Sequence, residues 1–291
     1  MARFVCGRFI DKAAFLNSRH SNACSVTDVE EAKQVIRVLP IWLTVIFPST
    51  IVVQGLSLFI KQAMTMDRHM GSNFEIPPGS IGVFFQIPLL FTIPIYDRLL
   101  IPLLRRFTGY PRGITILQRI GVGMMLQSIA LVAAVLTEIV RLDVVESHGI
   151  AYDKDAIVPL SFLILIPQLV IMGEAMVEVG KLEFFYDQAP ESMRSMGSAI
   201  YAASNGIGSF LSSAILTLVT HVTGRHRHKS WVLNNLNASR LDYFYALLLV
   251  LNIMNSVVFM TMSLSYTYKT EPSEAFGKAS SKETLVVDNS V

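Results

Sequence analysis

Three ionisable residues, Glu174, Glu178 and Lys181, lie in an otherwise apolar stretch of the sequence, residues 158–182. A charge at the centre of a membrane-spanning helix costs about 2.5–3.5 kcal/mol on insertion scales, so such residues are candidates for a functional role. At about 100° per residue they fall at about 0°, 40° and −20° around the axis and share one helix face. That face must meet a polar cavity or another helix. In the simpler alternative, Glu178 and Lys181 form an i, i+3 ion pair that neutralises the face.

Polar residues in two other apolar stretches could line the same cavity. Gln54 lies in the middle of residues 35–63, and Phe59 follows about one turn later. Tyr201 and Asn205 are four residues apart, so they share a helix face. Gln54 could instead make a hydrogen bond between helices, worth about 0.6–2 kcal/mol in a membrane, and Tyr201 and Asn205 could face the helix bundle.

Small residues recur every four positions in residues 197–220, at Ser204, Gly208 and Ser212. Such a stripe lets two helices approach closely, so it predicts a packing seam. A smooth seam of this kind also permits one helix to slide along another.

Helices that cross a membrane are needed to place these groups. Only 16% of the 291 residues are charged and 52% are hydrophobic, whereas soluble domains carry about a quarter charged residues. The apolar residues gather in blocks near the length of about 20 residues that spans about 30 Å of hydrocarbon. Barrel strands would instead show as alternating segments of about ten residues. We therefore predict an all-α membrane domain over 35–266, with six transmembrane helices at about 35–63, 79–101, 118–140, 158–182, 197–220 and 241–266.

The flanks and loops predict the orientation of these helices. Residues 1–34 are polar and are expected to be a cytoplasmic segment, and residues 267–291 a disordered cytoplasmic tail. Lys and Arg are more frequent in the connections that this orientation places inside. The sequon Asn237-Ala238-Ser239 falls in a loop placed outside, where Asn237 offers a glycosylation site. The net charge of +2 is too small to indicate nucleic acid as a partner.

Long strings of sequence resemble one known family. They are FIDKAA and VTDVEEAKQVIRVLPIW near the start, TMDRHMGSNFEIPPGSIGVF, PIYDRLLIPLLRRFTGYPRGITILQRIG, and VGKLEFFYDQAPESMRSMGSA. Together they resemble the plant nitrate and peptide transporter family, also called the proton-dependent oligopeptide transporters. The resemblance runs from about residue 9 to residue 266.

The resemblance implies a major facilitator fold of twelve helices in two halves, of which this chain matches helices seven to twelve. It implies membrane lipid, a small solute and protons as partners, together with a missing N-terminal half of six helices. Protons as coupling ions and no other cofactor are expected. The expected location is a plasma or vacuolar membrane.

The resemblance also implies roles for single residues. Glu174 falls where the family commonly has an acidic residue facing the substrate cavity, where it could bind a cationic group or take up a proton. Gln54 matches a polar position that lines the cavity. Glu178 and Lys181 depart from the family, which usually has small or uncharged polar residues there, so they would change which solutes fit or cancel each other.

A cluster of charges at the cytoplasmic end of the second predicted helix resembles the loop signature of facilitator proteins. It consists of Asp97 and Arg98, followed by Arg105 and Arg106. By that resemblance, contacts between Asp and Arg latch one transport state closed. The alternative is a plain anchor that follows the positive-inside rule, which Asp97 does not need.

Four functions remain to be compared. The sequence has no HExxH or GxSxG motif and no paired metal cluster, so neither an enzyme nor a metal site is predicted. A channel has no visible filter motif to support it. The main prediction is the C-terminal half of a proton-coupled transporter for nitrate, peptide or a related metabolite. The last alternative is a truncated or regulatory half without transport activity of its own.

Overall fold

The computed structural model describes residues 26–71, 74–95, 98–99, 101–108, 114–153, 156–171, 174–189, 194–224, 231–233 and 235–266. The predicted C-terminal tail and most of the predicted N-terminal segment lie outside these residues. The elements in chain order are α2 (Val26–Met64), β1 (Met66–Asp67), η1 (Pro78–Ser80), α3 (Ile81–Ile95), α4 (Ile101–Thr108), α5 (Ile116–Ser147), β2 (Val158–Ser161), η3 (Phe162–Leu165), α6 (Ile166–Ile171), α7 (Glu174–Gln188), α8 (Arg194–Gly224), η5 (Leu236–Ala238) and α9 (Leu241–Leu264).

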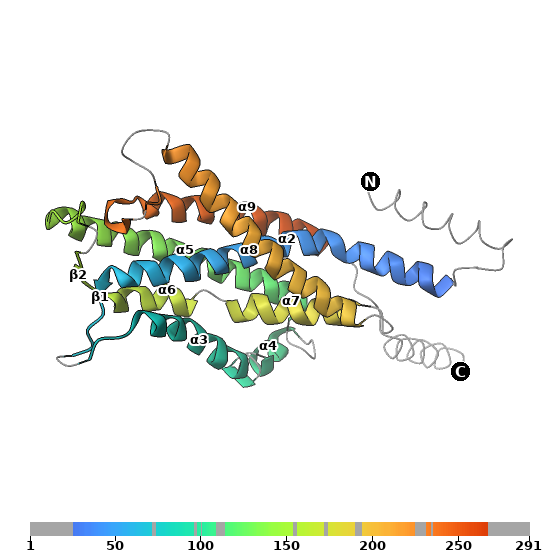
Figure 1. Cartoon of the computed structure of the whole chain (residues 1–291). Helices are drawn as coiled ribbons and strands as arrows, with labels where there is room; N and C mark the ends of the chain where they lie inside the picture. Colours follow the sequence, from blue (N-terminus) through green and yellow to red (C-terminus); the bar gives the residue numbers. More distant parts are fainter. Residues whose placement is uncertain are drawn as a thin grey trace, which may run out of the picture.

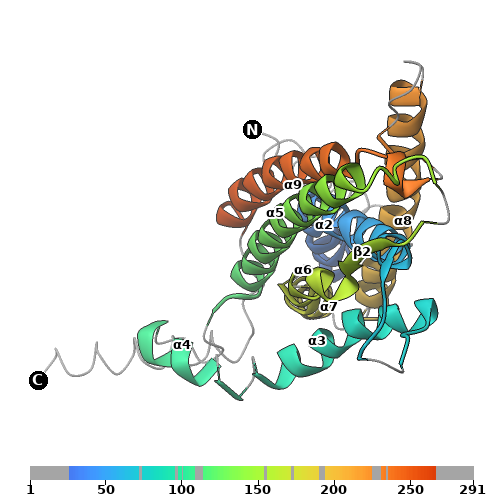
Figure 2. The same cartoon turned by 90° about the vertical axis from the view of Figure 1, so that its left-hand side faces the viewer.

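Four of these helices are long and apolar enough to cross a membrane: α2, α5, α8 and α9. In Figure 1 they run along the molecule together with α6 and α7, and α8 crosses the others obliquely. Figure 2 shows α2 in the middle, with α5 and α9 on one side of it and α6 and α7 on another. The helices α3 and α4 lie at the edge of the bundle. We call the end that carries β1, β2 and η5 the strand end.

Two of the six apolar blocks contain more than one of the described elements. The block at 79–101 contains α3 and reaches only the first residue of α4. The block at 158–182 begins as strand β2 and a 3-10 turn, and continues as α6 and then α7. Proline explains part of the difference, since Pro159 lies in β2 and Pro167 is the second residue of α6, where its missing N–H costs no helix bond.

The helix α2 continues through two prolines, Pro40 and Pro48. Proline has no N–H, so Pro48 leaves the carbonyl of Thr44, four residues earlier, without its helix partner. Asn255 of α9 donates its Nδ2 to that carbonyl oxygen at 2.9 Å. The neighbouring helix thus replaces the lost bond, as expected for proline in a spanning helix.

The predicted small-residue stripe forms the seam between α2 and α8. Ser204 and Ser212 are buried, and Gly208 lies against the backbone of α2. A Cβ added at Gly208 would lie 2.7 Å from Cβ of Ser49 and 3.1 Å from the carbonyl oxygen of Ile46. Only a residue without a side chain fits this close approach.

At the strand end, the short strands β1 and β2 pair in parallel. Met66 pairs with Val158 and Asp67 with Ser161, with a register shift between them. Because β1 follows α2 and β2 follows α5, this pair joins the ends of two long helices. Met66 of this pair belongs to a buried apolar cluster together with Ile76.

Candidate functional site

A cavity of about 340 Å³ opens between α2, α7 and α8. Ser49, Val52 and Val53 of α2 form one side, and Glu178 of α7 with three α8 residues forms the other; the α8 residues are Tyr201, Asn205 and Ser209. One wall is therefore partly apolar and the other is polar and charged. Such a mixture is typical of sites that bind small molecules.

The charge of the cavity comes from an ion pair on α7. Lys181 Nζ contacts Glu178 Oε1, so the predicted i, i+3 pair is present. Lys181 is fully buried, whereas 17% of the Glu178 side chain is exposed. The carboxylate, and not the ammonium group, is therefore the charge that the cavity exposes.

Side chains from α2 and α8 hold the pair in place. Lys181 Nζ also donates to Ser49 Oγ at 2.7 Å and to Asn205 Oδ1 at 2.8 Å. The other carboxylate oxygen, Glu178 Oε2, accepts from Tyr201 Oη at 2.9 Å and from Asn205 Nδ2 at 3.2 Å. Three helices thus share one network around two charges, and a buried pair is tolerable only when its remaining donors and acceptors are satisfied in this way.

Four of the predicted cavity residues are thus brought together: Glu178, Lys181, Tyr201 and Asn205. A carboxylate that can be reached from a cavity can take up a proton or bind a cationic group, and its neighbouring hydroxyl groups can hydrogen-bond a polar solute.

The remaining predicted cavity residues lie elsewhere or cannot be placed. Gln54 is buried and accepts a hydrogen bond from the Ser212 hydroxyl of α8, which is the predicted alternative of a bond between helices. Phe59 is buried in the apolar core with its ring centroid 5.6 Å from that of Tyr245. Glu174 is the first residue of α7, and its side chain lies outside the described part of the structure.

The residues of the predicted cytoplasmic gate lie around α4. Arg105 and Arg106 occupy the last turn of this helix and are exposed. Arg98 is also exposed and precedes α4, while Asp97 lies outside the described residues. Because Asp97 cannot be placed, the latch stays a prediction.

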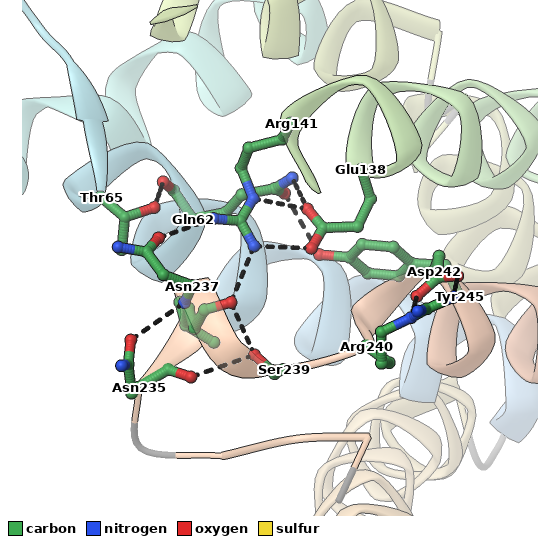
Figure 3. Close-up of polar contacts among 11 residues, drawn as sticks. Gln62, Thr65, Glu138, Arg141, Asn235, Asn237, Ser239, Arg240, Asp242 and Tyr245 are labelled. Atoms are coloured by element: carbon green, nitrogen blue, oxygen red, sulfur yellow. Dashed lines mark hydrogen bonds and ion pairs between the residues drawn. The ribbon is translucent and has the colours of Figure 1, made fainter. Parts of the chain in front are cut away.

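A second buried ion pair, which was not predicted from the sequence, lies at the strand end (Figure 3). Glu138 and Arg141 of α5 are both fully buried. Arg141 donates Nη2 to Glu138 Oε1 at 2.7 Å and Nε to Glu138 Oε2 at 2.8 Å. The two residues are three apart near the end of an apolar helix, which is the local spacing that could have indicated the pair.

Groups from three other segments surround this pair. Gln62 of α2 donates Nε2 to Glu138 Oε2 at 2.6 Å, and Tyr245 of α9 donates its hydroxyl to Gln62 Oε1 at 3.3 Å. Arg141 donates Nη1 to Asn237 Oδ1 at 2.9 Å and Nη2 to the carbonyl oxygen of Leu236 at 2.8 Å. The network therefore joins α5 to α2, α9 and η5 at one point.

Two charged groups outside the long helices have shifted pKa values. The backbone N–H and the ring of His69 hydrogen-bond Asp67 and lower the pKa of its carboxyl group. Hydrogen bonds to Asp242 raise the pKa of Arg240, which precedes α9. Within the part of the chain that the structure describes, no three His, Cys, Asp or Glu residues are grouped to hold a metal ion.

Comparisons with known proteins agree with the predicted family. A sequence profile of the POT family matches residues 8–232. Protein NRT1/PTR family 5.2 of Arabidopsis thaliana is 42% identical over 272 residues, which cover 92% of this chain and 47% of that protein. Protein NRT1/PTR family 8.1 of the same plant is 41% identical over 283 residues, covering 94% and 49%. The chain thus spans about half the length of these relatives.

Two solved structures share the fold. An auto-inhibited POT family peptide transporter superposes with a TM-score of 0.66 at 19% identity, covering 91% of this chain and 46% of the other. The POT family transporter PepTSo superposes with a TM-score of 0.62 at 20% identity, covering 83% and 43%. The predicted fold class, an all-α membrane protein corresponding to one half of a major facilitator fold, is confirmed. With the profile matching most of its residues, the chain belongs to the POT family of integral membrane transporters.

Proposed function

We propose that this chain is the C-terminal half of a proton-coupled secondary transporter for a small solute such as nitrate, a peptide or a related metabolite. The observation that carries the proposal is the cavity lined by Glu178, Tyr201 and Asn205 within an apolar bundle. In transporters of this kind the solute site lies between two repeats near the middle of the bilayer. The cavity is this chain's share of that site.

Coupling to protons is assigned to the acidic residues of α7, Glu174 and Glu178. Support comes from the position of Glu178, whose carboxylate is partly exposed to the cavity while its partner Lys181 is buried. A proton that enters with the solute can therefore reach this carboxylate without crossing the apolar core. Ionisable residues inside spanning helices commonly mark ion pathways and proton relays.

A second half is needed for this activity. Alternating access requires one bundle to rock against the other around the site. The 340 Å³ cavity has walls from α2, α7 and α8. We therefore expect that residues 1–291 by themselves cannot enclose a solute between two halves and do not transport it. The membrane could be the plasma membrane or the vacuolar membrane, because both provide a proton gradient directed into the cytosol.

The test is a fused carrier made of the first six helices of protein NRT1/PTR family 5.2 and this chain. Nitrate and dipeptide uptake would be measured in oocytes at acidic and at neutral external pH. We expect acid to stimulate uptake, and Glu174→Gln or Glu178→Gln to remove the stimulation. The matched control is Glu183→Gln, which changes an acid of the same helix whose partner is Arg119 of α5. Uptake of the same size at both pH values would refute proton coupling, and unchanged pH dependence in a variant would remove that residue from the role.

A further inference from the structure

Asn237, the first residue of the sequon, is buried by the fold. Only 2% of it is exposed. Its Nδ2 donates to the carbonyl oxygen of Ala156 at 3.1 Å and reaches that of Asp153 at 3.5 Å, and its Oδ1 accepts from Arg141 at 2.9 Å. Both ends of the amide are therefore engaged, and the side chain ties two loops of the strand end to α5.

The sequon serine is equally enclosed. Ser239 is fully buried, and its hydroxyl donates to the carbonyl oxygen of Leu236 at 2.8 Å. The same carbonyl oxygen also accepts from Arg141 Nη2, so Ser239 and Arg141 share one acceptor, as Figure 3 shows. We call Glu138, Arg141 and Asn237 the outer clasp.

Glycosylation of Asn237 is incompatible with this geometry. The reaction joins Nδ2 to the anomeric carbon of the first sugar and breaks the bond from that carbon to a phosphate oxygen of a lipid-linked donor. The lipid phosphate leaves with the bonding electrons, and one proton of Nδ2 passes to a base of the transferase. It would thereby delete an N–H that bonds the loop of Asp153 and Ala156, and it would place a bulky polar group where only 2% of the residue is exposed. N-linked glycans belong on surface segments.

We propose that the sequon is a fold-dependent site: Asn237 stays unmodified in the folded chain and accepts a glycan only when the outer clasp is open. The tripeptide then stabilises the folded strand end, and a glycan on Asn237 identifies chains in which the contacts of the outer clasp have not formed. The predicted orientation, which places this loop outside, is compatible with the proposal but does not by itself lead to modification.

The test is translation of the chain in microsomes, followed by endoglycosidase digestion and gel mobility. We expect the wild type to show no shift. Arg141→Ala removes the central donor of the clasp and should give a glycosylated band that Asn237→Gln abolishes. The matched control is Arg119→Ala, an arginine of the same helix whose partner, Glu183, lies in α7; this variant should stay unmodified.

A second control identifies the compartment that the loop faces. Tyr152 is 93% exposed in the loop after α5, and Tyr152→Asn with Lys154→Thr creates a sequon there that should be glycosylated. Absence of this glycan would overturn the proposal, because the compartment and not burial would then keep Asn237 bare. A glycan on Asn237 in detergent-purified, monodisperse wild-type chain would also overturn it, as would an unmodified Arg141→Ala chain.

Discussion

The buried pair at the strand end leads to a sharp stability prediction for Glu138→Gln. Both Glu138 and Arg141 are fully buried, and the carboxylate accepts two of the guanidinium N–H groups at 2.7 and 2.8 Å. The substitution keeps the shape but removes the charge, and it turns one acceptor into a donor facing another donor. Removing one partner of a buried pair costs about 3–5 kcal/mol, because the other charge is left uncompensated.

The matched control is Glu183→Gln, which changes the ion pair between Glu183 and Arg119. Their side chains are 31% and 12% exposed, respectively, and the charged atoms are 2.8 Å apart. A pair that water can reach contributes about 1 kcal/mol or less. Thermal unfolding of the purified chain in detergent separates the two cases. At roughly 2–4 °C per kcal/mol, Glu138→Gln should lower the Tm by about 6–20 °C and Glu183→Gln by less than about 4 °C. An equal or smaller loss for Glu138→Gln would refute the reasoning.

Two further predictions concern the seams of α2. Asn255→Leu leaves the carbonyl freed by Pro48 without a donor and should lower the free energy of unfolding by about 1–3 kcal/mol. In a Pro48→Ala background this loss should be smaller. An equal loss in both backgrounds of the double-mutant cycle would contradict the proposed replacement bond. Gly208→Ala should cost about 1–3 kcal/mol through overpacking against α2, whereas Gly206→Ala on the open side of α8 should be neutral or slightly stabilising in the same unfolding assay.

The charged face of α7 could be predicted because it depends on local spacing. Residues four and three apart on a helix share a face whatever the helix packs against, so the pair of Glu178 and Lys181 follows from the sequence. The position of Ser49 beside Lys181 could not be predicted in the same way. It depends on how α2 packs against both α7 and α8, and the close approach of α2 to Gly208 is part of that three-dimensional packing.

The outer clasp shows a different limit. By the positive-inside rule, Arg141 near a helix end is interpreted as a loop charge. An Asn-x-Ser tripeptide is most simply interpreted as a surface site. Both interpretations change once Asn237 is seen to close the network of Glu138. The contact spans 96 residues of chain, so no local pattern could indicate it.

The same limit applies to the fourth apolar block. Its hydrophobicity indicates a spanning segment, but hydrophobicity alone does not distinguish one helix from the succession of β2, α6 and α7. The pairing of Met66 with Val158 depends on a second segment far away in the chain, and it is this pairing that starts the block as a strand.

The central claim is that this chain supplies one half of a solute site and works with a second half. The most direct measurement is proton-driven solute uptake into liposomes containing either residues 1–291 alone or the fused carrier at equal protein amounts. We predict uptake at the level of empty liposomes for the chain alone, and gradient-dependent uptake for the fused carrier that Glu178→Gln reduces. Uptake by the chain alone that matches the fused carrier would contradict the account.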